Sequence, residues 1–308
     1  MLAEIFYWLL SMSANGAIAG ILILLVGRIK ALPRRVALAL WILPLLRLWV
    51  PFGLSGKYGF LALLPNNAVK TVMISDELLE ITVSNDFQAA RSYFPIVYKT
   101  DRLQSLYETG ALVWLISAAA ILITLTVLYR STKSELADAV RLHGQIYLSS
   151  KITGPAVYGI LRPRILLPDG WQHRDQRELA LILTHEQSHV SHRDNLWRLI
   201  GFVTAAIHWF NPLVWILLKR FLAELELACD ERVLAQYGEG SKKDYALTLV
   251  GCAEEKTLFA SPFLSSGPKL RTRIDHILSF RKLTAVSALC SCLLFLAMGY
   301  ILLTNAPR

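Results

Sequence analysis

Residues 184–192 have the sequence Thr-His-Glu-Gln-Ser-His-Val-Ser-His, which contains the metallopeptidase pattern HExxH at His185, Glu186 and His189. On an α-helix the two histidines are four residues apart and project from one face, where their imidazoles can bind a single zinc ion. Glu186 lies beside them and can serve as the general base of peptide hydrolysis. A pentapeptide also arises by chance, so its surroundings must support the site.

The residues before the motif predict a helix. Asp175–Thr184 combines early carboxylates with good helix formers and an apolar stripe that leads into the histidines. Neither Gly nor Pro interrupts the chain between Asp175 and Ile200. The pattern therefore places HExxH within a helix, as zinc binding by both histidines requires.

A later acidic stretch offers a third ligand, which a catalytic zinc site needs while its fourth position stays open. Ala223–Glu231 contains Glu226, with Asp230 one turn later. We expect Glu226 to bind zinc and Asp230 to accept a hydrogen bond from a ligand histidine. Cys229 is expected to pack in the core. The alternative for this stretch is a solvent-facing acidic helix.

The chain is too apolar for an ordinary soluble protein, since 54% of its 308 residues are hydrophobic and its mean hydropathy is +0.44. Four segments are long enough to cross a bilayer with few charges: Ile5–Val26, Val36–Leu54, Ala111–Tyr129 and Leu283–Leu303. For Arg47, within the second segment, we expect snorkelling toward the headgroups. The first segment is too long and lacks the basic start of a cleavable signal peptide.

The distribution of Lys and Arg predicts the orientation. The loop between the first two segments holds four basic residues and no acid, which indicates the cytoplasm. Residues 55–110 carry five basic and six acidic residues, whereas 131–282 carry 20 Lys and Arg against 16 Asp and Glu. Both termini should therefore lie outside. The net charge of +9 follows from this asymmetry, and no motif indicates direct nucleic-acid binding.

The predicted fold class is thus a mainly α membrane protein with four spans. Its parts are 1–54 with two spans, the extracellular loop 55–110, the third span 111–130, a cytoplasmic zinc metallopeptidase domain 131–282, and 283–308 with the fourth span and a short extracellular tail. Within the domain, Gln145–Ser150 and Gly154–Pro168 predict short edge strands. An extended peptide substrate can pair with such an edge, although a plain structural hairpin is an equal alternative.

The ordered motifs resemble the BlaR/MecR family of integral-membrane metallopeptidases. They are His185–His189, His192–Asp194, Trp209–Trp215 and Glu226–Glu231, with Tyr158–Pro168, Tyr245–Leu249 and Leu270–Ile274 in the family's order. The resemblance covers nearly the whole chain. It implies a gluzincin zinc site, a place in the bacterial plasma membrane, and a role in antibiotic-resistance signalling through cleavage of the protein itself and of a cytoplasmic transcriptional repressor.

The sequence departs from the family pattern at its end. The best-known members continue into an extracellular penicillin-binding sensor, whereas this sequence ends at Arg308, so we expect no such sensor. The Ser-x-x-Lys pattern at Ser266–Lys269 lies on the cytoplasmic side without companion motifs and is expected to be coincidental. Another protein, or the loop 55–110, would then supply the signal.

Self-cleavage is expected within residues 258–274. Ser261–Pro268 holds two prolines, a glycine and three serines, which predicts an exposed loop where proteolytic nicking concentrates. The basic end, Leu270–Ile274, is an equal candidate. Cleavage would occur within one molecule or between neighbours, as in a homodimer. An inert linker is the alternative.

Two side chains are candidates for stabilising the oxyanion, Tyr245 and His208, although each is more often a packed residue. His192 is expected to be a solvated histidine at a helix end. Two other functions stay open: a quality-control membrane protease of the HtpX/Ste24 type, which would lack the Asn211–Trp215 motif, and a non-catalytic signalling protein with a structural zinc site.

Overall fold

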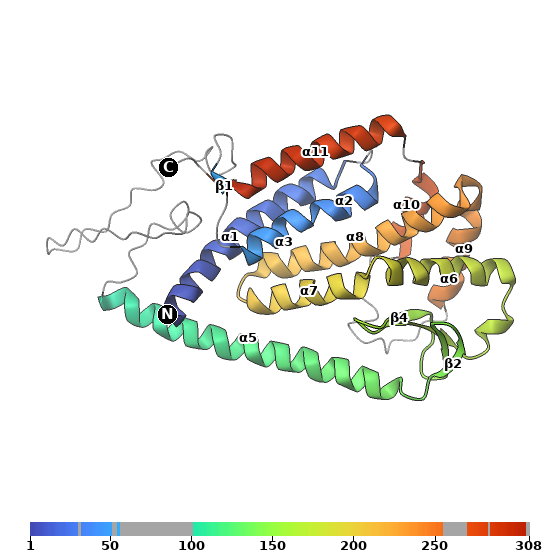
Figure 1. Ribbon diagram of the computed structural model, residues 1–308, viewed down its shortest axis with the longest axis horizontal. Helices are drawn as coiled ribbons and strands as arrows, with labels where there is room; N and C mark the ends of the chain where they lie inside the picture. The colour runs from blue at the N-terminus through green and yellow to red at the C-terminus, as the bar shows by residue number, and fades with distance from the viewer. Residues whose placement is uncertain (30–31, 51–53, 56–100, 255–269, 283, 306–308) are drawn as a thin grey trace.

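The computed structural model describes residues 1–29, 32–50, 54–55, 101–254, 270–282 and 284–305. The fold is mainly helical, as predicted, with a small sheet at one end. In Figure 1, α1, α7 and α8 run side by side between α11 on one side and the long α5 on the other, and the sheet lies at the end where α6, α9 and α10 gather.

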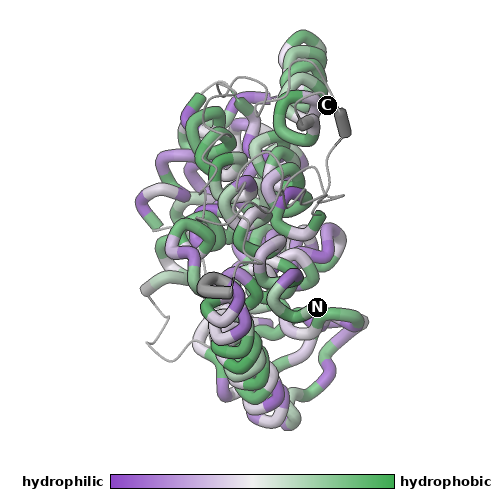
Figure 2. Tube along the Cα trace, turned by 90° about the vertical axis from the view of Figure 1, so that its left-hand side faces the viewer, coloured by the Kyte–Doolittle hydropathy of each residue, from purple (hydrophilic) through white to green (hydrophobic). Residues whose placement is uncertain are grey.

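Within the described residues, three helices are long and apolar enough to cross a membrane: α1 (Leu2–Val26), α5 (Asp101–Glu135) and α11 (Ala285–Leu303). Helix α5 begins ten residues before the predicted span and continues past it. Figure 2 shows α5 and α11 coloured mostly as hydrophobic. Large apolar side chains on both helices, such as Ile123 and Leu289, are more than half exposed. Surfaces of this kind suit lipid hydrocarbon better than water.

The second predicted span forms two short helices, α2 (Arg34–Leu40) and α3 (Ile42–Trp49). Pro44 has no N–H to donate to the carbonyl of Leu40, and its ring crowds that carbonyl, so the helix is interrupted there. The amide of Trp41 bonds instead to the carbonyl of Leu38, at 3.1 Å. Four crossings therefore stay a prediction, and most of the predicted loop 55–110 lies outside the described residues.

The side chain of Arg47 does not extend toward the headgroups, as we had expected it to. Its side chain is buried, with Nε 2.5 Å from the carbonyl of Leu302 and Nη2 3.2 Å from that of Thr304. The guanidinium thus caps the carboxyl end of α11, where the last carbonyl groups have no partner within the helix. Nearby, β1 (Leu54–Ser55) pairs with β6 (Thr304–Asn305).

The predicted strands are present. In the four-stranded sheet the order is β2-β3-β5-β4, from β2 (Val140–His143), β3 (Ile146–Ser149), β5 (Arg164–Pro168) and β4 (Ala156–Tyr158). Strand β2 was not predicted, and its four residues are all exposed. Among the described residues β4 pairs with β5 alone, so its other edge has no strand partner there.

The predicted helix around HExxH is α6 (Gln176–Ser191), preceded by the short helix η3 (Trp171–His173). Asp175 caps α6, since its carboxylate accepts the amides of Arg177 and Glu178 at 3.0 and 3.1 Å. The helix ends at Ser191, although no Gly or Pro follows until Gly201. Arg193 has a positive φ of 54°, which ends α6 and starts a new helix.

That new helix is α7 (Asp194–Ile207), which turns back into α8 (Pro212–Tyr237). Asn211 caps α8 and Pro212 occupies its first turn, a sequence pattern typical of helix starts. After η4 (Glu239–Ser241) come α9 (Lys242–Glu254) and α10 (Leu270–Ser279). A core of Leu181, Val233, Tyr245, Leu249 and Ile277 joins α6, α8, α9 and α10.

One part of the predicted cleavage region, Leu270–Ile274, differs from our expectation because it lies in α10. Leu270–Ile274 is helical, and the guanidinium of Arg273 is engaged in ion pairs, so this end is not an exposed loop. A protease needs an extended chain, and a hydrogen-bonded helix resists that change. The rest of the predicted region, 258–269, lies outside the described residues.

Candidate metal centre and active site

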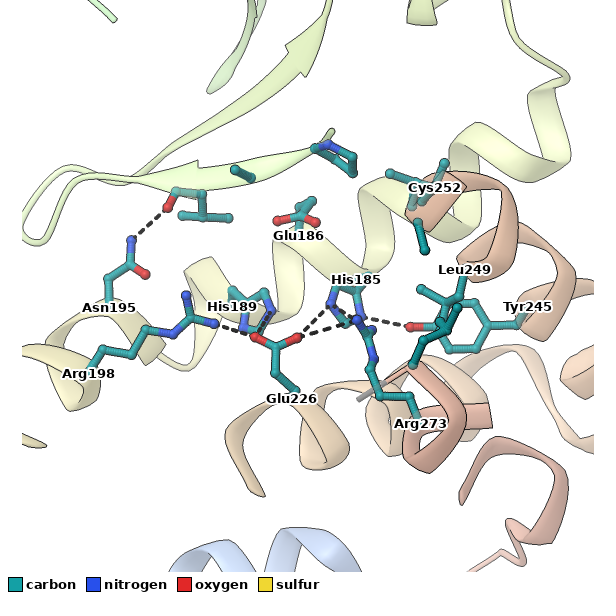
Figure 3. A pocket seen from close by; sticks show the side chains of 16 residues that line it. His185, Glu186, His189, Asn195, Arg198, Glu226, Tyr245, Leu249, Cys252 and Arg273 are labelled. Atoms are coloured by element: carbon teal, nitrogen blue, oxygen red, sulfur yellow. Dashed lines mark hydrogen bonds and ion pairs between the residues drawn. The ribbon is translucent and has the colours of Figure 1, made fainter. Parts of the chain in front are cut away.

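Helix α6 presents the HExxH residues together at the wall of a cavity. The rings of His185 and His189 lie 4.8 Å apart at nearly a right angle. These two residues and Glu186 are each 6% exposed, although all three line a cavity of about 190 Å³. Figure 3 shows Glu186 near the strand that covers the cavity, with His185 and His189 between it and Glu226.

Glu226 faces both histidines from α8. Its Oε2 lies 3.7 Å from Nε2 of His185, and its Oε1 lies 3.7 Å from Nε2 of His189. A tetrahedral zinc ion with bonds of about 2.0–2.1 Å would hold two ligand atoms about 3.3 Å apart. Each distance from Glu226 to a histidine is therefore within a few tenths of an ångström of the separation that zinc needs.

His189 is oriented by a neighbour in sequence. Its Nδ1 lies 2.6 Å from Oδ2 of Asp194, which is 1% exposed. The left-handed turn at Arg193 brings this carboxylate back toward the histidine, and such strained turns often mark functional sites. With Nδ1 bonded to a carboxylate, Nε2 is left to face Glu226, the usual arrangement of a metal-binding histidine.

His185 is oriented by residues from three later helices. Its Nδ1 lies 2.7 Å from the hydroxyl of Tyr245, which in turn donates to Oδ1 of Asp230, also at 2.7 Å. Asp230 additionally accepts two bonds from Arg273, at 2.6 and 2.8 Å. Oδ1 of Asp230 therefore lies next to His185, at 3.3 Å from Nδ1.

Two arginines neutralise the buried carboxylates. Arg198 donates to Oε1 of Glu226, and Nη1 of Arg273 lies 3.7 Å from Oε2. Burial alone would raise the pKa of Glu226, but His189, His185 and the two guanidiniums hold that pKa well below its usual range. Burial likewise opposes ionisation of Asp230, yet Arg273 lowers its pKa to about 2. Both carboxylates are ionised at neutral pH, as metal ligation and its support require.

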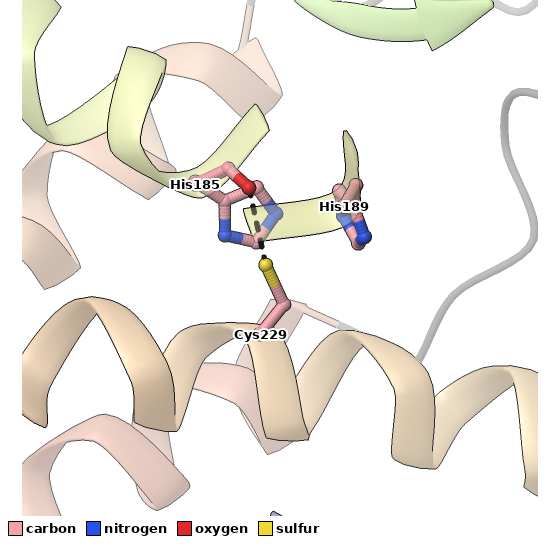
Figure 4. A group of neighbouring side chains, drawn as sticks. All are labelled: His185, His189 and Cys229. Carbon is pink, nitrogen blue, oxygen red and sulfur yellow. Dashed lines mark hydrogen bonds between the residues drawn. The ribbon is translucent and has the colours of Figure 1, made fainter. Parts of the chain in front are cut away.

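Cys229 offers a second ligand set, with His185 and His189 (Figure 4). The three possible ligand atoms lie within 4.8 Å of one another. Burial alone would raise the pKa of the thiol, but the two histidines lower it to about 7. However, Sγ is directed at the backbone carbonyl of His185, 3.2 Å away. Glu226 faces the Nε2 atoms of both histidines and lines the cavity, so we favour Glu226 as the third ligand.

The two oxyanion candidates are placed differently from our expectation. The hydroxyl of Tyr245 is held between His185 and Asp230, and its side chain is fully buried. His208 is remote from the site, with Nε2 bonded to the carbonyl of Leu48 at 3.0 Å. His192 caps the end of α6 and is exposed, as predicted.

Sequence reasoning missed several residues that line or support the cavity. They are Asp194, Asn195, Arg198 and Arg273. Asp194 belongs to His192–Asp194, one of the motifs that resemble the BlaR/MecR family. A search for carboxylates near each histidine in the sequence would have found it. Arg273 lies 88 residues after His185, and only the packing of α10 brings it to the site. No local pattern in the sequence indicates that contact.

Two HExxH histidines facing one buried carboxylate, with further carboxylates behind them, are a set of side chains that can hold a metal ion. Comparison with known proteins agrees: residues 6–277 match the model of the family described as BlaR1 peptidase M56. The chain belongs to this family of metallopeptidases, which favours it over the HtpX/Ste24 alternative and implies a metal, typically zinc.

Curated relatives of known name match about half of the chain. It is 31% identical over 176 residues to the regulatory protein BlaR1 of Bacillus licheniformis. It is 25% identical over 171 residues to the methicillin resistance mecR1 proteins of Staphylococcus aureus and Staphylococcus epidermidis. Each match covers 54% of this chain and 29% of the relative's length.

Proposed function

We propose that the protein is a membrane-bound zinc metalloendopeptidase that cuts peptide bonds on the cytoplasmic side in transmembrane signalling. The observation that carries the proposal is the position of Glu226, 3.7 Å from the Nε2 atoms of both HExxH histidines. His185, His189 and Glu226 would hold the metal. When bound, zinc acts as a Lewis acid and lowers the pKa of a water.

The remaining chemistry belongs to protein groups. Glu186 takes a proton from the attacking water and delivers it to the leaving amine, a task that needs a carboxylate in the cavity wall. Asp194 and Asp230 keep the histidine rings oriented. Arg198 lines the cavity beside Glu226 and is better placed than Tyr245 or His208 to stabilise a developing oxyanion.

The free edge of β4 is the proposed binding site for the peptide. Pro155, Ala156 and Val157 line the cavity opposite the histidines. The side-chain amide of Asn195 donates to the carbonyls of Val157 and Gly159, at 3.1 and 3.0 Å, and so fixes the strand against α7. An extended peptide pairing with β4 would cross the cavity between the strand and Glu186.

Self-cleavage within residues 258–269 is part of the proposal. Ala253, near the end of α9, and Leu270, the first residue of α10, both line the cavity. The segment between them therefore leaves from and returns to the rim of the active site. This tether gives it a high effective concentration there. A cytoplasmic repressor is the proposed second substrate.

The proposed topology has four crossings, with α2 and α3 together making the second and both termini outside. A cysteine-accessibility scan tests it. Reagent outside intact cells should label positions in 55–100, whereas Gly170→Cys should react only after permeabilisation. Labelling of Gly170→Cys from outside would overturn this topology.

The proposed activity is tested by comparing the wild type with Glu186→Gln in the same membrane preparation. Because Glu186 handles protons and binds no metal, the variant should keep its zinc and lose hydrolysis by about 10²–10⁴-fold. Terminal sequencing then locates any cut. Identical fragments from both proteins would assign the cut to a contaminant. Full zinc occupancy with no hydrolysis of any test peptide by the wild type would favour a structural zinc site.

A further inference from the structure

The α7–α8 hairpin extends away from the metal centre and lies against α1. At its tip, Phe210 packs 6.1 Å from Phe6 in an edge-on contact. Nδ2 of Asn211 donates to Ser13, at 2.8 Å to the hydroxyl and 3.2 Å to the carbonyl. One face of the hairpin therefore follows α1 along most of that apolar helix (Figure 1).

Farther along α8, Leu217 occupies the space above Gly20. A Cβ added to Gly20 would lie 2.3 Å from the Leu217 side chain, so only glycine permits this approach. Since both helices advance by about 1.5 Å per residue, the pairs Asn211–Ser13 and Leu217–Gly20 show that α8 runs in the same direction as α1.

Two other helices hold the hairpin through polar side chains. The indole of Trp114 on α5 donates to the carbonyl of Ile207 at 2.8 Å. The indole of Trp49, at the end of α3, donates to the hydroxyl of Thr204 at 2.8 Å. Trp114 belongs to the apolar stretch of α5, so its partner Ile207 lies at the same level as that stretch.

The outward face of α8 changes in character along its length. Leu213, Trp215 and Ile216 are 38%, 40% and 53% exposed. One turn later the exposed residues are Lys219 and Arg220. Apolar side chains followed by basic ones are typical of a helix that leaves hydrocarbon at a headgroup layer.

We propose that the α7–α8 hairpin is a re-entrant membrane element, with the exposed side chains of Leu213, Trp215 and Ile216 in contact with lipid acyl chains. The inference rests on the proposed placement of α1 and α5 across the bilayer. It removes the hairpin from the predicted cytoplasmic domain 131–282. Nonpolar residues at these positions cost nothing in lipid, whereas in water they would form an exposed patch.

The hairpin also sets the depth of the metal centre. Along α8, Asn211 and Glu226 are about 22 Å apart at 1.5 Å per residue. Ser13, the partner of Asn211, is about 20 Å from Val26 at the end of α1 by the same measure. Glu226 therefore lies about level with the cytoplasmic end of α1. The active site faces substrate at the membrane surface rather than deep in the cytoplasm.

Site-directed spin labelling of the full chain in phospholipid nanodiscs tests the proposal. Single cysteines would be placed at Ile216 and, as a second hairpin position, Leu213, with Cys290 and Cys292 replaced by alanine because both are exposed. Ile123→Cys on α5 is the lipid control, and Leu161→Cys, at a 91% exposed position near the sheet, is the aqueous control. Relaxation by oxygen reports lipid, and relaxation by a water-soluble nickel chelate reports water.

Ile216→Cys and Leu213→Cys should be more accessible to oxygen than to the chelate, as Ile123→Cys is, with the order reversed at Leu161→Cys. An aqueous result at both hairpin positions, with Ile123→Cys still in lipid, would overturn the re-entrant hairpin alone. An aqueous result at Ile123→Cys as well would also overturn the membrane placement on which the proposed function depends.

Discussion

The two histidines of the metal centre are supported in different ways. His189 depends on Asp194, five residues away, through a turn that α6 and α7 make by themselves. His185 depends on Tyr245, Asp230 and Arg273, which arrive on α9, α8 and α10. One half of the site is thus fixed locally and the other by long-range packing. Movement of α10 would disturb His185 and leave His189 in place.

The largest effect is expected from removing the group that the two halves share. Glu226→Ala should abolish zinc binding, with a loss of affinity beyond the roughly 10–100-fold that outer contacts contribute. Zinc per protein after dialysis measures this. Cys229→Ala is the matched variant on the same helix and should keep its zinc. The reverse outcome, with zinc lost from Cys229→Ala and kept in Glu226→Ala, would replace the third ligand.

The second-largest effect is expected from removing the carboxylate that lies next to each histidine. Asp194→Ala and Asp230→Ala should each weaken zinc affinity by about 10–100-fold, because each histidine loses the partner that orients it. Competition with a fluorescent chelator measures the affinity. Hydrogen exchange of α10 should separate the two variants: Asp230→Ala accelerates it and Asp194→Ala does not. Equal acceleration would show that the halves are not independent.

The ion pair between Arg273 and Asp230, which supports His185, should make the stability of the fold depend on pH. Asp230 has a folded pKa of about 2, below its unfolded value of about 3.9. Its ionisation therefore stabilises the fold above pH 4, and this contribution is lost as the pH falls from about 4 to 2. Arg273→Gln should raise that pKa and be less stable than the wild type at neutral pH, with the difference vanishing near pH 2. Denaturant unfolding of metal-free protein measures it, and a pH-independent difference would contradict the assignment.

The smallest effect is expected at Tyr245. Tyr245→Phe removes the hydroxyl between His185 and Asp230 but keeps the buried ring, so zinc affinity should fall by no more than about tenfold. Hydrolysis per bound zinc should stay unchanged, because the hydroxyl is held away from substrate. A loss of turnover at full zinc occupancy would restore Tyr245 as an oxyanion helper.

The sequence was informative where local chemistry decides structure. Asp175, Asn211 and Pro212 carry helix-start preferences that need no tertiary contact, and helices begin there. The spacing of HExxH fixes two side chains on one face in any helix. Glu226 was predicted because zinc chemistry demands a third ligand, and the acidic stretch was the one that offered it.

Long-range contacts explain what could not be predicted. Arg193 adopts a left-handed conformation without the glycine that usually signals one, so its sequence gives no sign of the turn. Tyr245 and Arg273 meet His185 only after α9 and α10 pack. Arg47 is buried because the end of α11 supplies carbonyl groups across 255 residues of sequence. The interruption of the second predicted span, by contrast, could have been predicted, because a proline inside a helix disturbs it.

The ion pairs between α2 and α8 bear on how this protein can be divided. Arg34 pairs with Glu224 at 3.2 Å and Arg35 with Glu231 at 2.9 Å, on either side of Glu226 in sequence. Helix α8, which carries Glu226, is therefore joined to the start of α2 at two points. The helices that carry the candidate site, α6–α10, are therefore not structurally independent of the amino-terminal helices. If α6–α10 were expressed without the amino-terminal helices, or joined to another membrane anchor, α8 would lose these two ion pairs. Glu226 would then be held less firmly in its position.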